Sequence, residues 1–199
     1  MTRPAANGGV VAITLLLFAV ACIPPRPSPT PAPTAPATPT PSPTSSSVVV
    51  DPALLDLLPS DIEGVALQAD PDTASEIAAE GSIAPFVSAI ALASAFGPLA
   101  TDTPGDYVVV TVARLRPGTF SDLFYRGWRD TFDAAVCEQA GGVDGHAETE
   151  IGGHQTFIGT CSGGVHTYHV HLPAQDAIVS MQGLGEGRYA EHVIAGLTE

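Results

Sequence analysis

The 199-residue chain contains no lysine and only seven arginines, against 21 aspartates and glutamates. Its formal net charge is −14 with neutral histidines. Proteins that bind nucleic acids through phosphates need a basic face that releases counterions from the backbone. The scarcity of positive charge therefore excludes most classes of nucleic-acid-binding protein.

The N-terminal apolar segment is too short to span a bilayer. It runs over residues 10–20, about 11 residues, whereas a spanning helix needs about 20. Arg3 precedes this segment, and the small residues Ala19-Val20-Ala21 stand at its end, directly before Cys22. A cation, a short apolar run and a small-residue cleavage site are typical of a secretory signal peptide. We therefore expect residues 1–21 to be a signal peptide.

The motif Ala19-Val20-Ala21-Cys22 resembles the lipobox of bacterial lipoproteins. The family usually has leucine at the position of Ala19. The resemblance implies that Cys22 is acylated and becomes the N-terminus after cleavage, so that lipid anchors the protein to the cell membrane on its extracytoplasmic side. The alternative is ordinary signal-peptidase cleavage after Ala21, which would release an unanchored product.

Cysteine is also scarce, with three residues in the chain. An odd count in an exported protein leaves one thiol for another purpose. If Cys22 carries lipid, Cys137 and Cys161 remain, and a disulfide between them suits an oxidising compartment. The alternative is a pair of buried, reduced thiols.

Residues 22–47 form a Pro/Thr/Ser-rich linker that holds ten of the 19 prolines. This composition cannot bury a core and favours the extended polyproline conformation. At about 3.1 Å per residue, such a linker reaches on the order of 75 Å. We expect it to separate the lipid anchor from the folded domain.

Residues 48–199 form an acidic domain that carries all 21 acids and five arginines, a local net charge of −16. We expect anionic lipids and nucleic acids to repel this domain. The charge serves solubility, or else attraction of cations or basic partners. The sequence does not identify the protein or small-molecule ligand that the domain binds.

Hydrophobic periodicity divides the domain into helices and strands. We expect helices over residues 51–58, 70–80, 84–96, 120–136 and 186–197, and strands over 65–68, 107–113, 146–150, 154–161, 165–172 and 177–182. The last four strands predict an antiparallel meander. Helices before and after it predict a single α+β domain with helices packed on one face of the sheet.

Three histidines form the most specific candidate site. Strand alternation places His169 and His171 on one face, and a two-residue turn at Gly163-Gly164 would add His154 to the same face. Three imidazoles with an open fourth position are a catalytic zinc arrangement, so His154, His169 and His171 are candidate ligands for zinc or another transition metal. The alternatives are a solvated strand face and a pH-responsive histidine patch. A three-residue turn would move His154 to the opposite face.

The segment Gly159-Thr160-Cys161-Ser162-Gly163 has the spacing of a nucleophile elbow, but the following segment reads as a strand where that motif requires a helix. We therefore expect no catalytic residue. The sequence favours a non-enzymatic binding or envelope-accessory lipoprotein. The alternative is an exported metal-binding protein or metal-dependent enzyme that uses the histidines.

Overall fold

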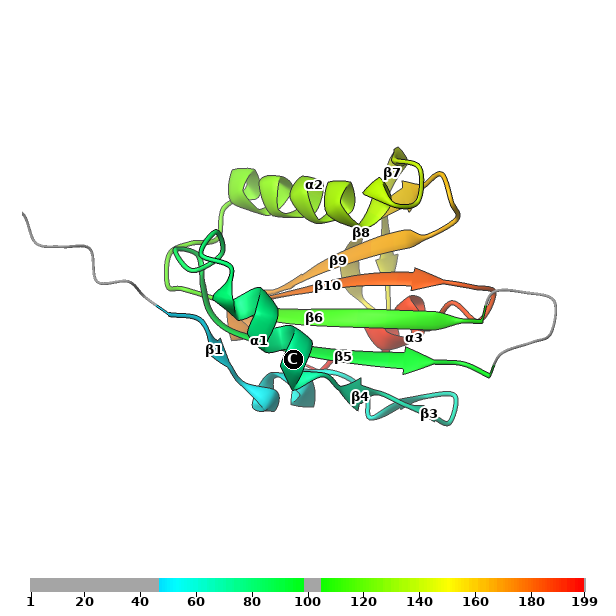
Figure 1. Ribbon diagram of the computed structural model, residues 1–199, viewed down its shortest axis with the longest axis horizontal. Helices are drawn as coiled ribbons and strands as arrows, with labels where there is room; N and C mark the ends of the chain where they lie inside the picture. Colours follow the sequence, from blue (N-terminus) through cyan, green and yellow to red (C-terminus); the bar gives the residue numbers. More distant parts are fainter. Residues whose placement is uncertain (1–46, 99–104, 199) are drawn as a thin grey trace, which may run out of the picture. The chain divides into compact units, whose positions relative to one another are not determined.

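The computed structural model describes residues 47–98 and 105–198, which form an α+β domain around one eight-stranded sheet. The strand order is β1-β5-β6-β10-β9-β8-β7, and β4 pairs with part of β5 (Figure 1). All neighbours are antiparallel except β1 and β5. The predicted signal peptide, Cys22 and nearly all of the predicted linker lie outside the described residues.

The strands of the sheet are β1 (Val49–Val50), β4 (Gln68–Ala69), β5 (Val87–Phe96), β6 (Tyr107–Leu115), β7 (Val143–Ile151), β8 (His154–Cys161), β9 (His166–Leu172) and β10 (Ala177–Leu184). A small separate hairpin pairs β2 (Asp61–Ile62) with β3 (Val65–Ala66). The helices are the 3₁₀ turns η1 (Pro52–Leu57) and η2 (Pro173–Gln175), and α1 (Pro71–Ala79), α2 (Asp122–Glu138) and α3 (Tyr189–Ala195). The predicted meander is confirmed as β7-β8-β9-β10.

The expectation of a helix over residues 84–96 is wrong, because this segment forms the long strand β5. Its charge-free, alanine-rich composition suits a buried helix, but β5 pairs with β1 and β4 on one side and with β6 on the other. Ladder hydrogen bonds on both sides of the strand override intrinsic helix propensity.

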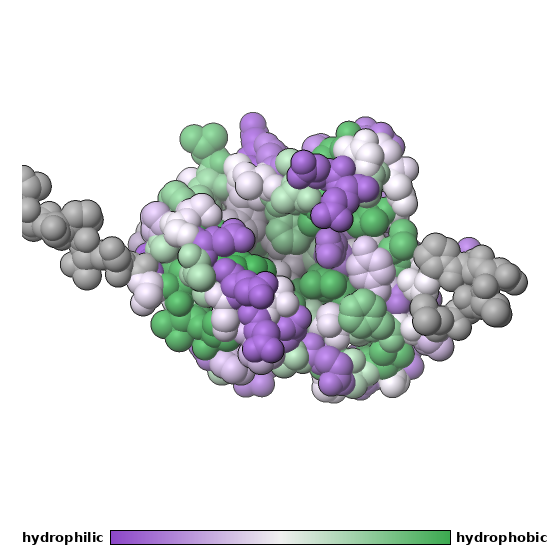
Figure 2. Space-filling model, in the orientation of Figure 1, coloured by the Kyte–Doolittle hydropathy of each residue, from purple (hydrophilic) through white to green (hydrophobic). Residues whose placement is uncertain are grey.

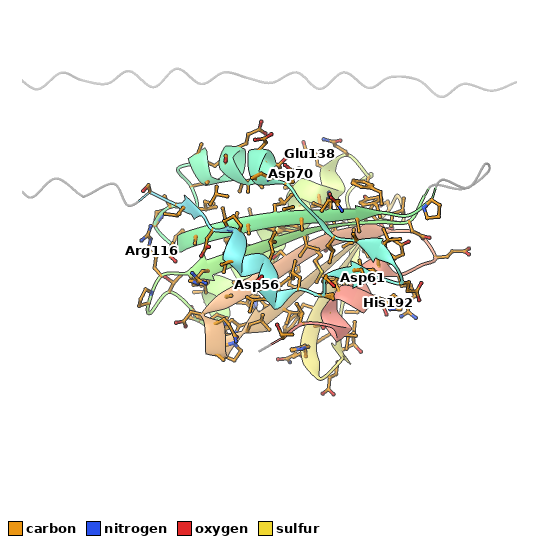
Figure 3. All side chains as sticks on the ribbon, turned by 90° about the horizontal axis from the view of Figure 1, so that it is seen from below. Asp56, Asp61, Asp70, Arg116, Glu138 and His192 are labelled. Atoms are coloured by element: carbon orange, nitrogen blue, oxygen red, sulfur yellow. A yellow bond between two sulfur atoms is a disulfide. The ribbon has the colours of Figure 1, made fainter. Side chains whose placement is uncertain are left out.

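The helices divide between the two faces of the sheet, whereas the sequence predicted helices on one face only. In Figure 1, α1 lies in front of the sheet and α3 behind it, and the view from below in Figure 3 separates them in the same way. η1 and α3 cover the larger core, which includes Leu54, Val110, Met181, Val193 and Ile194. α2 covers a smaller cluster on the other face, built around Val87, Ala113, Leu115, Tyr125 and Ile178. Figure 2 shows hydrophilic side chains gathered over α1 on the viewed face.

Side-chain caps mark where two helices begin. The Asp70 carboxylate (Figure 3) accepts hydrogen bonds from the Thr73 backbone N–H at 3.0 Å and from its hydroxyl at 2.8 Å. The backbone hydrogen bond from Thr73 is the main reason why the Asp70 pKa lies below its ordinary value. Ser121 caps α2 in the same way, through the backbone N–H of Phe124.

Helix α2 confirms the helix predicted over residues 120–136, but its buried face differs from the one that apolar spacing indicates. Apolar residues recur there at spacings of three and four: Phe120, Leu123, Phe124, Trp128, Phe132 and Val136. Of these, Leu123 is 81% exposed. The fully buried positions are Tyr125, Asp133 and Cys137. The helix is therefore rotated toward a face that carries a charged residue.

The predicted disulfide between Cys137 and Cys161 is present, with the two Cα atoms 5.1 Å apart. It joins the C-terminal turn of α2 to the end of β8. By the chain-entropy model, a bridge that closes a loop of 24 residues stabilises the fold by about 3.5 kcal/mol. Disulfides of this kind are typical of proteins outside the cytoplasm. Within residues 47–98 and 105–198, no helix is long and apolar enough to cross a membrane.

Candidate functional site: a buried aspartate–histidine cluster

The structure separates the three predicted metal ligands. The β8–β9 register pairs Phe157 with His169 and Thr156 with Val170. The turn therefore contains three residues, Ser162 to Gly164, closed by a hydrogen bond from the Cys161 N–H to the Val165 carbonyl at 2.9 Å. This register puts His154 on the opposite face from His169 and His171, so the expected three-histidine patch does not form.

The two histidines that do share a face lie in different environments. The His171 ring stacks on Phe120 with centroids 3.6 Å apart and planes 6° apart. Burial lowers the pKa of His171, against an opposing effect of Asp176. His169 is only 1% exposed and packs edge-on against Phe132. Among the described residues, no group of three or more His, Cys, Asp or Glu side chains is arranged to hold a metal ion.

The partner of His169 is Asp133, a buried carboxylate on α2. Nε2 of His169 lies 2.9 Å from Oδ1 of Asp133, and Nε2 of the half-exposed His146 lies 3.1 Å from Oδ2. The hydroxyl of Thr167 donates a third, short hydrogen bond to Oδ1. Three donors from β7 and β9 thus converge on one carboxylate whose side chain is 2% exposed.

A second chain of hydrogen bonds enters the cluster from Trp128. Its indole Nε1–H donates to the Ser180 hydroxyl at 2.9 Å, and Ser180 Oγ lies 3.0 Å from Nδ1 of His169. An indole can only donate, so the Ser180 hydroxyl accepts from Trp128 and its own proton is available to Nδ1 of His169. The Nε2–H of His169 then donates to Asp133. One consistent direction of donation therefore runs from Trp128 through Ser180 and His169 to the carboxylate.

These contacts determine the charge of Asp133. Burial acts to raise its pKa, but hydrogen bonds from His169 and Thr167 and the charges of the two histidines outweigh that effect. The pKa of Asp133 consequently lies below its ordinary value. A buried carboxylate is tolerated where several hydrogen bonds satisfy its ionised form.

Gly159 makes room for the carboxylate on the sheet. A Cβ atom added at this position would lie 2.8 Å from Oδ2 of Asp133 and would also clash with the Thr167 hydroxyl. Only glycine allows Asp133 to come this close to β8. Gly159, the first residue of the apparent nucleophile elbow, therefore allows close packing. Cys161 of the same motif is bonded to Cys137 in the disulfide.

Sequence reasoning missed Asp133, although a signal for it was present. Tyr125, Arg129, Asp133 and Cys137 recur every four residues and so share one face of a helix. Because Cys137 was expected to reach Cys161, that face had to lie against the sheet. The disulfide and the four-residue spacing together place Asp133 inside.

A cavity of about 200 Å³ lies beside this cluster, between α2 and the strands β7 and β8. Asp133, His146 and His169 line it, together with Arg126, Arg129, Asp130, Ala147, Phe157 and Ile158. The Arg129 guanidinium lies 3.7 Å from the centroid of the Phe157 ring. This cavity borders the buried network, because Asp133, His146 and His169 belong to both.

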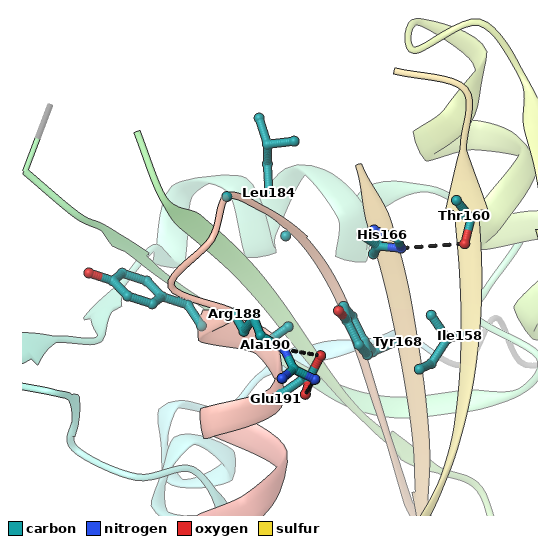
Figure 4. A pocket seen from close by; sticks show the side chains of 11 residues that line it. Ile158, Thr160, His166, Tyr168, Leu184, Arg188, Ala190 and Glu191 are labelled. Carbon is teal, nitrogen blue, oxygen red and sulfur yellow. Dashed lines mark hydrogen bonds and ion pairs between the residues drawn. The ribbon is translucent and has the colours of Figure 1, made fainter. Parts of the chain in front are cut away.

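A second cavity, of about 230 Å³, lies on the other face beside the start of α3 (Figure 4). Its charged groups are already paired, because Arg188 forms an ion pair with Glu191. His166 contacts the Thr160 hydroxyl at 3.4 Å, and burial raises the pKa of Tyr168 to about 12. A third hollow, lined by Glu148, Thr149, Glu150 and Gln155, lies on the exposed β7–β8 hairpin.

Comparisons with protein-family models, with curated proteins and with solved structures found no match to the chain.

Proposed function

We propose that this protein is a membrane-anchored lipoprotein of the bacterial cell envelope, whose folded domain is a non-enzymatic binding or accessory module outside the cytoplasm. Lipid on Cys22 holds the chain at the membrane, and the Pro/Thr/Ser-rich linker of residues 22–47 carries the domain away from it. The disulfide between Cys137 and Cys161 is the observation that carries this proposal.

The cysteine count supports both export and acylation. The chain has three cysteines, and two of them are bonded to each other. A disulfide favours an oxidising compartment, which the domain reaches through an export signal. Cys22 is the cysteine left over, and it stands directly after the small residues of the cleavage site. Acylation gives this third cysteine a use that requires no partner.

Burial argues against catalysis by Ser180, His169 and Asp133, a group with the composition of a hydrolytic triad. Ser180, His169 and Asp133 are hydrogen-bonded in series, but Ser180 is fully buried and His169 is 1% exposed. The Ser180 hydroxyl also accepts the Trp128 N–H. A nucleophile must reach its substrate, whereas this hydroxyl lies under α2. The series therefore supports a role in holding α2 to the sheet.

The anchor is tested by expressing the full chain in a bacterial host that processes lipoproteins. Mass spectrometry of the mature N-terminus should find it at Cys22, with diacylglycerol and fatty acid attached. The wild-type protein should partition into the detergent phase. Cys22→Ala should move to the aqueous phase or retain its leader.

Thr34→Ala serves as the matched control, because it changes the linker but keeps Cys22. This variant should partition like the wild type. A mature wild-type chain that starts after Ala21 without lipid, or an intact leader on the wild-type protein, would refute the proposal.

A further inference from the structure

The two arginines beside the buried cluster differ from the other three in the described part of the chain. Arg114 pairs with Asp51 at 3.1 Å, and Arg188 pairs with Glu191. Arg116 (Figure 3) donates to the carbonyls of Ala84 and Ser47 at 2.9 and 3.1 Å. Within the described residues, Arg126 and Arg129 form no hydrogen bond or ion pair with protein groups, and both line the cavity next to Asp133.

Stacking holds the Arg129 guanidinium in place. Its Cζ atom lies 3.7 Å from the Phe157 centroid and 5.0 Å from that of Tyr125. A guanidinium stacked on an aromatic face keeps its N–H groups in one plane, where they match a planar carboxylate by two parallel hydrogen bonds. The Nε atom of Arg129 is buried and has no hydrogen-bond partner in the described part of the chain. Such a buried donor costs about 1–3 kcal/mol while it stays unpaired.

The acids of the cavity do not neutralise these arginines. Asp133 is saturated by donors from Thr167, His169 and His146. Asp130 remains at the exposed rim. Arg126 and Arg129 therefore keep guanidinium groups without a hydrogen-bonding protein partner among the described residues, in a domain whose net charge is −16. Unpaired guanidinium N–H groups favour an anion as the ligand.

Size and lining define the class of anion. A volume of about 200 Å³ holds about seven water molecules at ~30 Å³ each. It is smaller than the roughly 300 Å³ at which pockets for drug-sized ligands begin. The ring of Phe157 provides an apolar wall next to the arginines. The geometry points to a small organic carboxylate with a short hydrocarbon body.

We propose that the cavity between α2 and β7–β8 binds such a carboxylate, with Arg129 as the main ligand-binding residue and Arg126 as a second cation at the rim. This inference names the ligand class of the binding role proposed above and does not depend on the lipid anchor. Loss of lipid on Cys22 would leave the affinity unchanged, whereas loss of binding would leave the anchoring intact.

The test is calorimetric titration of the purified full chain with butyrate and succinate, at an ionic strength matched with chloride. At least one of the two acids should bind with a dissociation constant on the order of 1 mM or tighter. Arg129→Gln should weaken that binding at least tenfold. Arg129→Lys should restore only part of it, because lysine keeps the charge but loses the planar fork.

Two further variants keep the result interpretable. Arg126→Gln changes an exposed position and should weaken binding without affecting the melting temperature, even if Arg129→Gln proves unstable. Arg188→Gln removes an arginine outside the cavity and should bind like the wild type. Equal affinity in the wild type, Arg126→Gln and Arg129→Gln would overturn the proposal. It would also be overturned if neither acid produced heat beyond that of chloride, or if phosphate bound and the carboxylates did not.

Discussion

Nε2 of His169 lies 2.9 Å from the carboxylate of Asp133, which precedes it by 36 residues and belongs to a helix on the surface of the sheet. This contact ties α2 to the central strand β9 in the region that the disulfide also joins. Charge, hydrogen bonding and covalent linkage thus act on the same helix.

Replacing Asp133 with asparagine should destabilise the domain strongly. Asparagine keeps the shape of the side chain but removes the charge and places an NH₂ group among donors. Leaving a buried hydrogen-bond donor unsatisfied costs about 1–3 kcal/mol. Urea unfolding should report a loss of this size. Asp130→Asn, on the exposed side of the same helix, should change stability by less than about 0.5 kcal/mol. Equal effects of the two substitutions would contradict the role of Asp133.

The same carboxylate should make stability depend on acid. The folded-state pKa of Asp133 is lowered, while the unfolded value is near 3.9. Its stabilisation is therefore fully present above the unfolded pKa and is lost as pH falls through the folded pKa. The gap in melting temperature between wild type and Asp133→Asn should be widest near neutral pH and should narrow below about pH 4. A gap that stays constant down to the acid limit of folding would exclude this linkage.

Gly159→Ala should destabilise the domain by pushing Asp133 away from the sheet. The added Cβ would lie 2.8 Å from Oδ2, and overpacking of this kind costs about 1–3 kcal/mol. Gly145→Ala on β7 is the matched control, because nothing lies within 4 Å of its Cβ. Chemical denaturation of the two variants measures the difference. If Gly159→Ala were as stable as Gly145→Ala, the close approach would be of no energetic importance.

Removing the disulfide should lower the free energy of unfolding by about 3.5 kcal/mol. The double variant Cys137→Ser/Cys161→Ser should show this loss, and the single variants should show a similar one because each breaks the same bond. Thiol titration of the unfolded wild-type domain without reductant should detect neither cysteine. Reaction of both would show that the bond does not form in the protein.

The class of fold followed from the sequence because its signals are local. Turn glycines and alternating residues located β7 to β10, and the helical period located α2. Residues 87–96 misled because alanine has high helix propensity and the segment carries no charge. A period of two is nevertheless present there: Ala89, Ala91, Ala93 and Ala95 face the core under η1 and α3, and Ile90 and Leu92 face the other side. Pairing with strands from other parts of the chain made this segment a strand and not a helix.

The candidate site depended on distances that a sequence does not contain. One extra turn residue between β8 and β9 moved His154 to the other face. Asp133 looked like an outward-facing charge because its three donors, Thr167, His169 and His146, come from two strands beyond the helix. The four-residue spacing from Asp133 to Cys137 was the one local indication that this carboxylate is buried.

Strand β7 ends the sheet, so one side of its backbone faces no neighbouring strand in the described part of the chain. Its Asp144, Glu148 and Glu150 all carry negative charge. A second copy that approached this border would bring like charges together before any ladder could form. Copies of this domain at high concentration would therefore repel one another at the edge where sheets most readily join into aggregates.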